Sequence, residues 1–281
     1  MDSRLTPFNG RLAHVSLRGL VEAERFVEGR MARVTEVITA LCDARGHRQR
    51  ELVLHERFEV LDEANGRSFG RAARDGYVGY VETRALGPDA ATTHVVAARQ
   101  SYLAPEPRLK AGAAVEAISH GSELNVSGHH EDGRWAEVTR AGTPCYIPAA
   151  HLRPLDTPEA DAAAVAERFI GTPYLWGGNS GFGIDCSGLV QAGFRACGIA
   201  CPGDSDLQRE GFGTRLSDDA ALRRNDLIFW KGHVAMMLDE RTMIHANDTH
   251  MAVTVEPLAA AIERISGRGD GPVLARKRVL T

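Results

Sequence analysis

A segment dense in glycine and proline leads directly into a short polar motif and a patterned apolar run. Residues 171–183 contain six Gly or Pro residues, too many for a regular helix or strand, so we expect a loop that opens a cleft. Asp-Cys-Ser-Gly follows at 185–188. Apolar side chains then recur at intervals of four and three residues, which predicts a helix over 187–197 that ends at Gly198.

Cys186 is therefore predicted to lie at the N-terminus of a helix. A thiol with an unperturbed pKa of about 8.5 is mostly protonated at neutral pH, and nucleophilic chemistry requires the thiolate. Backbone N–H groups and the positive end of the helix dipole favour an anion at this position, and they can also stabilise a developing oxyanion. The motif thus indicates an activated thiol nucleophile.

Two histidines downstream are candidates for the partner base. Apolar runs at 226–230 and 233–238 are separated by Lys-Gly and are typical of paired strands, with His233 opening the second. Residues 242–246 predict a third strand that contains His245. Adjacent antiparallel strands can place His245 beside His233, so we expect His233 to act as the base and His245 to fix its tautomer.

Each of these residues also has a simpler interpretation. A lone cysteine before a helix is usually a small buried apolar residue, and a lone histidine in a strand is usually a core residue with its hydrogen bonds satisfied. A zinc site built from Cys186, His233 and His245 is the other alternative. Because the chain lacks Cys-x-x-Cys and His-Glu-x-x-His, we expect no metal and no cofactor.

Four separate motifs now support a resemblance. Gly-Thr-Pro-Tyr-Leu-Trp-Gly-Gly at 171–178, Asp-Cys-Ser-Gly-Leu-Val-Gln at 185–191, Gly-His-Val at 232–234 and Ile-His-Ala-Asn at 244–247 resemble, in this order, the NlpC-type cell-wall cysteine peptidases. The resemblance implies a papain-like domain that cuts the amide between the γ-carboxyl of D-Glu and a diamino acid in peptidoglycan stem peptides. It assigns Cys186 as nucleophile, His233 as general base, His245 as orienter and Tyr174 near the oxyanion site.

The resemblance also implies how the substrate is read. In family members with this architecture, a pocket accepts only a free N-terminal L-Ala, whose ammonium is bound by the Asp before the nucleophile, here Asp185. The matching partners from the N-terminal part are Glu56 and Tyr77, with Tyr80 as the alternative to Tyr77. The positions that match groove-lining residues of the family are Trp176, Ser187 and Ser205.

These substrate-binding assignments have structural alternatives. Asp185 can instead be a helix-terminal carboxylate, Glu56 a solvated strand residue and Tyr77 a core residue. Trp176 can equally be buried packing, and Ser205 a turn residue. Gly203 departs from the pattern, because relatives commonly have Arg there; the change affects the expected fine specificity and leaves the nucleophile untouched.

Charge and composition limit the partners. Net charge is −4 with both signs interspersed, and aromatic residues make up 6% of the chain, so we expect no binding to nucleic acid or to an anionic membrane. No basic segment leads into an apolar one at the N-terminus, and the apolar runs are too short to cross a bilayer. Five cysteines without framework spacing favour a reducing compartment, so a cytoplasmic enzyme is expected.

A weak internal repeat precedes the peptidase-like part. Short alternating segments punctuated by Gly and Asp occur twice, which predicts two small barrels resembling bacterial SH3-like domains. We therefore expect an α+β protein: residues 1–88 as an N-terminal segment plus the first barrel, 89–156 as the second barrel, and 157–281 as the peptidase domain.

Residues 21–29 fit a short helix or an irregular lead-in, and 87–91 a linker. Thr157 is the expected N-cap of a helix that continues over 161–170.

The leading hypothesis is a cysteine peptidase that releases L-Ala-γ-D-Glu from free murein peptides during cell-wall peptide recycling, cutting before meso-diaminopimelate or Lys. One alternative is a catalytically inactive protein that binds wall peptides. Another is a papain-like amidase or acyltransferase with the same Cys–His chemistry. The sequence does not indicate which diamino acid is preferred, nor the oligomeric state.

Overall fold

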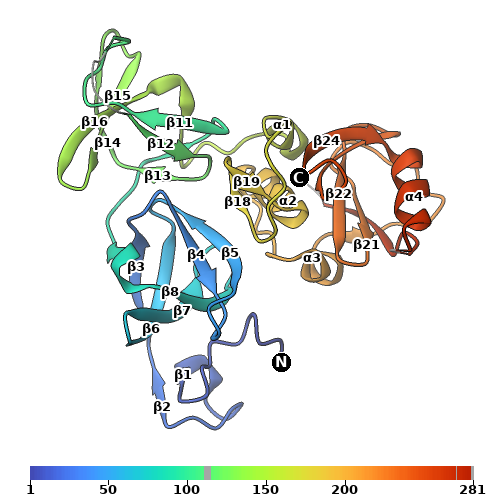
Figure 1. The fold of residues 1–281 in the computed structure, drawn as a ribbon, viewed down its shortest axis with the longest axis horizontal. Helices are drawn as coiled ribbons and strands as arrows, with labels where there is room; N and C mark the ends of the chain where they lie inside the picture. Colours follow the sequence, from blue (N-terminus) through green and yellow to red (C-terminus); the bar gives the residue numbers. More distant parts are fainter. Residues whose placement is uncertain (111–114, 270, 280–281) are drawn as a thin grey trace. The chain divides into compact units, whose positions relative to one another are not determined.

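The chain divides into two compact units, Met1–Asp156 and Thr157–Thr281. The structure is a computed structural model and describes residues 1–110, 115–269 and 271–279. Figure 1 shows that the first unit is built almost entirely of strands and the second combines strands with helices. Within these described residues, no helix is long and apolar enough to cross a membrane.

The N-terminal barrel is one curved sheet with strand order β5-β4-β8-β7-β6-β3-β9. Alternation sets its faces: on β6, Phe58 and Val60 are buried in the core while Arg57 is exposed. The β6–β7 hairpin turns at Asn65 and Gly66, both with positive φ, as a tight two-residue turn requires. The strands of the sheet are β3 (Arg30–Val34), β4 (Ile38–Cys42), β5 (Arg48–Val53), β6 (Arg57–Ala64), β7 (Arg67–Ala72), β8 (Val78–Glu82) and β9 (Leu86–Pro88).

The segment before this barrel contains strands and no helix at residues 21–29. β1 (Leu12–His14) pairs in parallel with β2 (Arg25–Val27), and a 3-10 turn, η1 (Val15–Leu17), connects them. Of the two interpretations of residues 21–29, the helix is therefore wrong. Phe26 and Val27 are half-buried strand residues instead.

A second strand-rich region follows, with its own apolar core around Val96, Ile118 and Ile147. It consists of two three-stranded sheets, β13-β10-β17 and β14-β15-β16, and the pair β11-β12. The predicted linker at 87–91 begins inside β9, and Asp89 accepts hydrogen bonds from Arg33 and Arg57. The elements are η2 (Thr83–Ala85), β10 (His94–Val96), β11 (Gln100–Leu103), β12 (Glu116–Ser119), β13 (Glu123–Leu124), β14 (Val126–His130), β15 (Trp135–Arg140), β16 (Thr143–Pro148), η3 (Ala149–His151) and β17 (Leu152–Pro154).

The C-terminal unit is organised around a six-stranded sheet with order β20-β25-β21-β22-β23-β24. A two-stranded ribbon, β18-β19, lies within the glycine-rich segment predicted as a loop. The elements are α1 (Ala162–Glu167), β18 (Asn179–Ser180), β19 (Gly183–Ile184), α2 (Cys186–Ala196), α3 (Ser205–Gly211), β20 (Thr214–Arg215), β21 (Leu227–Trp230), β22 (His233–Met237), β23 (Thr242–Asn247), β24 (Ala252–Pro257), α4 (Leu258–Gly267) and β25 (Ala275–Arg278).

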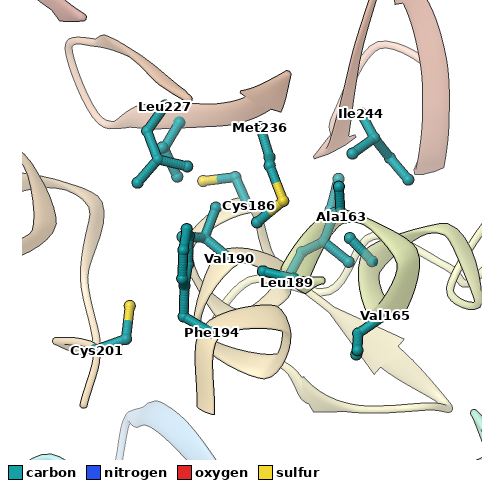
Figure 2. Packing of buried hydrophobic residues seen from close by; sticks show 14 of the residues in the cluster. Ala163, Val165, Cys186, Leu189, Val190, Phe194, Cys201, Leu227, Met236 and Ile244 are labelled. Carbon is teal, nitrogen blue, oxygen red and sulfur yellow. The ribbon is translucent and has the colours of Figure 1, made fainter. Parts of the chain in front are cut away.

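The two faces of this sheet pack against different helices. On β22, Val234 and Met236 join the core cluster that contains α1 and α2, whereas Ala235 and Met237 join the cluster that contains α4. Figure 1 shows α2 and α4 on opposite sides of β22. Figure 2 shows Cys186, Val190 and Phe194 of α2 gathered against Leu227 and Met236 of the sheet. The sheet is therefore buried on both faces, as its near-continuous apolar strands require.

The helix and strands predicted around the motif are confirmed. α2 begins at Cys186, one residue earlier than expected, and ends before Gly198, whose φ is +76°. The expected strands correspond to β21, β22 and β23. The cap of the first helix was predicted wrongly: α1 begins after Asp161, whose carboxylate accepts from the backbone N–H of Ala163, so this side chain caps the helix in place of Thr157.

The close approach of α1 and α2 generates a stability prediction at Gly193. Ala is favoured over Gly in a helix interior by about 1 kcal/mol. A Cβ at Gly193, however, would lie 2.7 Å from the backbone oxygen of Ala162. We expect Gly193→Ala to lower the free energy of unfolding by about 1–3 kcal/mol, measured by thermal or urea denaturation. Gly267→Ala, where a Cβ meets no atom within 4 Å, is the matched control and should not destabilise the protein.

Candidate active site

The carboxylate of Asp185 holds the start of α2 and the glycine-rich segment together. Its Oδ1 accepts from the backbone N–H of Gly188 at 2.6 Å and from the Ser187 hydroxyl at 2.9 Å, and its Oδ2 accepts from the backbone N–H of Gly177 at 2.9 Å. Gly188 is required because a Cβ there would lie 2.5 Å from the Gly178 oxygen. The Asp-Cys-Ser-Gly motif is thus a helix cap locked to the preceding loop.

Cys186 is the first residue of α2 and is only 6% exposed. Its Sγ lies 4.0 Å from the backbone oxygen of Gly232, the residue immediately before His233. The structure therefore brings the thiol to the backbone at the start of β22. In this arrangement the sulfur is directed to a carbonyl group. The His233 ring contacts Trp230 and His245.

The resting thiol is not a stabilised anion. Burial raises the pKa of Cys186 to about 12, and the negative charge of Asp185 acts in the same direction. Hydrogen bonds from the backbone N–H groups of Val234 on β22 and of Ser187 and Cys186 at the helix start lower the pKa, but desolvation outweighs them. The helix start therefore supplies only part of what a thiolate needs at this buried position.

His233 and His245 form the predicted pair. The Nε2 atom of His233 lies 2.8 Å from Nδ1 of His245, and the ring centroids are 5.1 Å apart. The two residues come from adjacent antiparallel strands, in which alternation puts both side chains on the same face. Burial lowers the pKa of each histidine to about 3, so both rings are neutral at physiological pH.

Glu256 and Arg264 extend this pair and were not predicted from the sequence. Nε2 of His245 lies 2.7 Å from Oε1 of Glu256, a close polar approach although the ring N–H is not well aligned with the oxygen. Arg264 donates to the same carboxylate. Glu256 lies on β24, diagonal to His245 in the strand register. In the sequence it is only an acid within a strand, and its position near His245 follows only from the pairing of β24 with β23.

The contact with Glu256 fixes which ring nitrogens carry protons. A bare Nε2 on His245 would direct its lone pair at a carboxylate oxygen 2.7 Å away, so the proton belongs on Nε2. Nδ1 of His245 is then the acceptor for the Nε2–H of His233. The remaining nitrogen of His233, Nδ1, is left unprotonated and is free to accept a proton.

Tyr174 lies close to the thiol. Burial raises the pKa of its hydroxyl, and the negative charges that Cys186 and Asp185 can carry raise it further. The tyrosine is half-buried, packs against the core that contains α2, and also lines the pocket in which His233 lies. Tyr174 therefore contacts both the core beside the sulfur and the pocket beside the His233 ring.

The other predicted groove residues lie before, within and after the motif in the sequence. Trp176 is 59% exposed in the glycine-rich segment, which argues against its interpretation as buried packing. Ser187 is buried and donates to Asp185. Ser205 is half-buried at the first position of α3, so it begins a helix and is not a turn residue. Gly203 lies just before α3.

Glu56 and Tyr77 belong to the N-terminal barrel. Glu56 is 3% exposed, forms an ion pair with Arg74 at 2.8 Å and accepts from the backbone N–H of Val53. Tyr77 is a core residue with the Arg50 guanidinium 5.8 Å from its ring centroid. Tyr80, its alternative, is half-buried and lies under the guanidinium of Arg67. Their role as readers of a substrate amine stays a prediction.

Across residues 1–110, 115–269 and 271–279, no set of three or more His, Cys, Asp or Glu side chains is arranged to hold a metal ion.

Comparison with known proteins identifies the domains. Residues 171–264 match the NlpC/P60 family, and residues 43–86 match the family described as "Bacterial dipeptidyl-peptidase Sh3 domain". The first match contains the whole Cys–His–His arrangement together with Glu256 and Arg264. The second lies in the barrel that contains Glu56 and Tyr77.

Two curated relatives extend the comparison. The γ-D-glutamyl-L-lysine dipeptidyl-peptidase of Bacillus cereus is 39% identical over 114 residues, which are 37% of this chain and 33% of the relative. The dipeptidyl-peptidase 6 of Lysinibacillus sphaericus is 28% identical over 164 residues, 55% of this chain and 60% of the relative. The chain thus spans between a third and three fifths of the length of these relatives.

A solved structure supports the fold. The NlpC/P60 family protein of Bacillus cereus superposes with a TM-score of 0.72 at 20% identity, covering 89% of this chain and all of that one. With the mixed helices and strands described above, this likeness confirms the predicted α+β class. The predicted resemblance is also confirmed: the chain combines a bacterial dipeptidyl-peptidase SH3 domain with a C-terminal, papain-like NlpC/P60 domain.

Proposed function

We propose that this chain is a cysteine peptidase that hydrolyses the γ-D-glutamyl–diamino acid bond of murein peptides with a free N-terminal L-Ala, releasing L-Ala-γ-D-Glu. The observation that carries the proposal is the pair His233–His245, joined at 2.8 Å next to the backbone on which the Cys186 thiol rests. The names of the similar dipeptidyl-peptidases support this substrate class.

The first half of the reaction begins with a neutral thiol. Sγ of Cys186 leaves the Gly232 carbonyl and attacks the γ-carbonyl carbon of D-Glu, while its proton passes to Nδ1 of His233. The backbone N–H at the start of α2 stabilises the oxyanion, with Tyr174 nearby. When the tetrahedral intermediate collapses, the C–N bond breaks and His233 gives its proton to the leaving amine.

The second half hydrolyses the thioester. Water attacks the same carbonyl carbon, and its proton passes to His233. The C–S bond breaks on collapse, the sulfur regains the proton from His233, and the γ-carboxyl of the dipeptide is released. His245 and Glu256 keep His233 in the tautomer that both halves require.

The N-terminal ammonium of the substrate is proposed to bind at Asp185, assisted by Glu56 and Tyr77. A carboxylate has about four acceptor sites, and Asp185 uses three of them within its own unit. One acceptor site is left for the substrate. An acylated N-terminus brings no charge to pair with it, so an enzyme of this kind selects peptides with a free N-terminal amine.

We propose a role in cell-wall peptide recycling within the cytoplasm. All five cysteines are present as thiols, and two of them, Cys42 and Cys145, are half-buried on strands of the N-terminal unit. Thiols in such numbers fit a reducing compartment.

Replacing the nucleophile tests the reaction. With purified protein and L-Ala-γ-D-Glu-meso-diaminopimelate, Cys186→Ala should lower release of L-Ala-γ-D-Glu by at least about a thousandfold, because the covalent route is lost. Release is measured by liquid chromatography with mass spectrometry. Cys197→Ala, at the other end of the same helix, is the matched control and should retain activity. Equal release by Cys186→Ala, or none by the wild type, would contradict the proposal.

The raised thiol pKa predicts the pH dependence of alkylation. Because burial raises the pKa of Cys186 to about 12, the thiolate is scarce at pH 7 and its fraction increases as pH rises. Against a thiol of pKa about 8.5, we expect iodoacetamide to react about a thousandfold more slowly at pH 7. The rate should climb without a plateau up to about pH 10. Timed alkylation with peptide mapping measures it, the urea-unfolded chain is the reference, and full reactivity below pH 7 would reveal a resting thiolate.

Removing the charge of Glu256 tests the tautomer assignment. Glu256 raises the pKa of His233, so Glu256→Gln should weaken the base: kcat should fall by about tenfold or more, and the acid limb of its pH profile should move to lower pH. KM should change little, because no substrate contact is removed. Glu263→Gln, which removes an exposed acid on the following helix α4, is the control. An unaltered pH profile for Glu256→Gln would reduce the carboxylate to a purely structural role.

A further inference from the structure

A pocket lies at the end of the sheet where β22 begins and β23 ends. Its lining includes Trp230, Lys231 and His233 from the β21–β22 hairpin, and Arg264 and Arg268 from the end of α4. Tyr174, which lies close to the thiol, forms part of the same wall. The pocket is therefore next to the proposed reaction centre, on the side of the imidazole.

The charged side chains that line this pocket are predominantly cationic. Lys231, Arg264 and Arg268 carry positive charge, Asp248 is the acid among the lining residues of the described chain, and His233 and His245 are neutral. Arg264 is compensated by Glu256. Arg268 lies 3.6 Å from Asp248, whose side chain is 75% exposed, so this pair is weak.

Two observations indicate that the positive charge in this pocket is only partly neutralised. The guanidinium groups of Arg264 and Arg268 both donate to the hydroxyl of Thr249, each at 2.8 Å, so two like charges are held close together. Like charges four residues apart on a helix destabilise it, although its C-terminus favours cations. Lys231 is exposed and makes no ion pair or hydrogen bond with the parts of the chain that the structure describes.

The chemistry of the proposed reaction determines which part of the substrate meets these cations. The leaving amine receives its proton from His233, so the residue that carries this amine must lie against the His233 wall. The acylating D-Glu and the L-Ala extend the other way, toward Asp185. The pocket of Lys231 and Arg268 is thus on the leaving-group side of the scissile bond.

We propose that this pocket binds the side-chain carboxylate of the leaving diamino acid, and that the enzyme therefore prefers meso-diaminopimelate to Lys. This inference rests on the proposed function. The side chain of meso-diaminopimelate ends in an ammonium and a carboxylate on the same carbon, whereas that of Lys ends in an ammonium alone. The carboxylate can therefore pair with Lys231, Arg264 and Arg268, whereas the lone ammonium of Lys is repelled by them. A guanidinium such as that of Arg268 pairs with a carboxylate through two parallel hydrogen bonds.

Three peptides test the inference with the wild-type protein. They are L-Ala-γ-D-Glu-meso-diaminopimelate, the same peptide with its side-chain carboxyl amidated, and L-Ala-γ-D-Glu-L-Lys. We expect kcat/KM to be at least about tenfold higher for the free carboxylate than for either of the others. Each peptide is also made with a C-terminal D-Ala, which removes the α-carboxylate of the leaving residue, and the preference should survive.

Variants then locate the preference in the pocket. Lys231→Gln and Arg268→Gln should each lower the kcat/KM ratio of the free to the amidated peptide by about two- to fivefold, and the double variant by more. Because this is a ratio within one preparation, partial misfolding cancels. Arg241→Ala, on the turn at the opposite end of the β22–β23 hairpin, is the matched control and should keep the wild-type ratio.

The outcomes separate this inference from the function on which it rests. If all peptides are cleaved equally, or the ratio is unchanged in the double variant, the carboxylate site is wrong and the peptidase stands. Loss of the preference on adding D-Ala would assign the pocket to the α-carboxylate and overturn the side-chain assignment. If the wild type cleaves none of the peptides, the proposed function fails and the inference fails with it.

Discussion

The site depends on how the carboxylate of Asp185 is used. It accepts hydrogen bonds from Gly188, Ser187 and Gly177, and so joins the first turn of α2 to the glycine-rich segment that precedes it. Without this connection, the first backbone N–H groups of the helix would lack partners, and the sulfur would have no fixed position relative to β22. The absence of a Cβ at Gly188 is part of the same constraint, because the Gly178 carbonyl occupies that space.

Burial is the dominant electrostatic influence on the thiol and on the two histidines. It raises the pKa of Cys186 to about 12 and lowers those of His233 and His245 to about 3, so every member of the set is neutral before substrate binds. Because the thiol and the imidazole are both neutral, proton transfer belongs to the attack itself and not to a resting ion pair. The orientation of the His233 ring then matters more than its resting charge. The close contact of Glu256 with His245 fixes that orientation.

Local patterns predicted the parts of this site that lie close together in sequence. The helix from Cys186 and the strands carrying His233 and His245 follow from periodicity and from breakers such as Gly198 and Gly232. Three features could not be predicted in that way. Glu256 and Arg264 meet His245 only through the pairing of β24 with β23 and the packing of α4. Asp161 and not Thr157 caps the first helix, and its carboxylate also accepts from Arg224, a contact between distant parts of the sequence that local spacing does not report. The pKa of the thiol depends on how deeply the helix start is buried, which sequence spacing does not report.

Binding of the substrate amine at Asp185 can change the pKa of the Cys186 thiol. Asp185 is the second cause, after burial, of the raised pKa of Cys186, since its negative charge lies next to the sulfur. If the free amine of the substrate binds at Asp185, as proposed, its positive charge offsets that of the carboxylate and lowers the pKa of the thiol. The same contact that selects an unblocked N-terminus would then make the sulfur easier to deprotonate. A blocked peptide would lose both effects, so discrimination would be expressed in the chemical step as well as in binding, as expected when binding energy is used in the transition state.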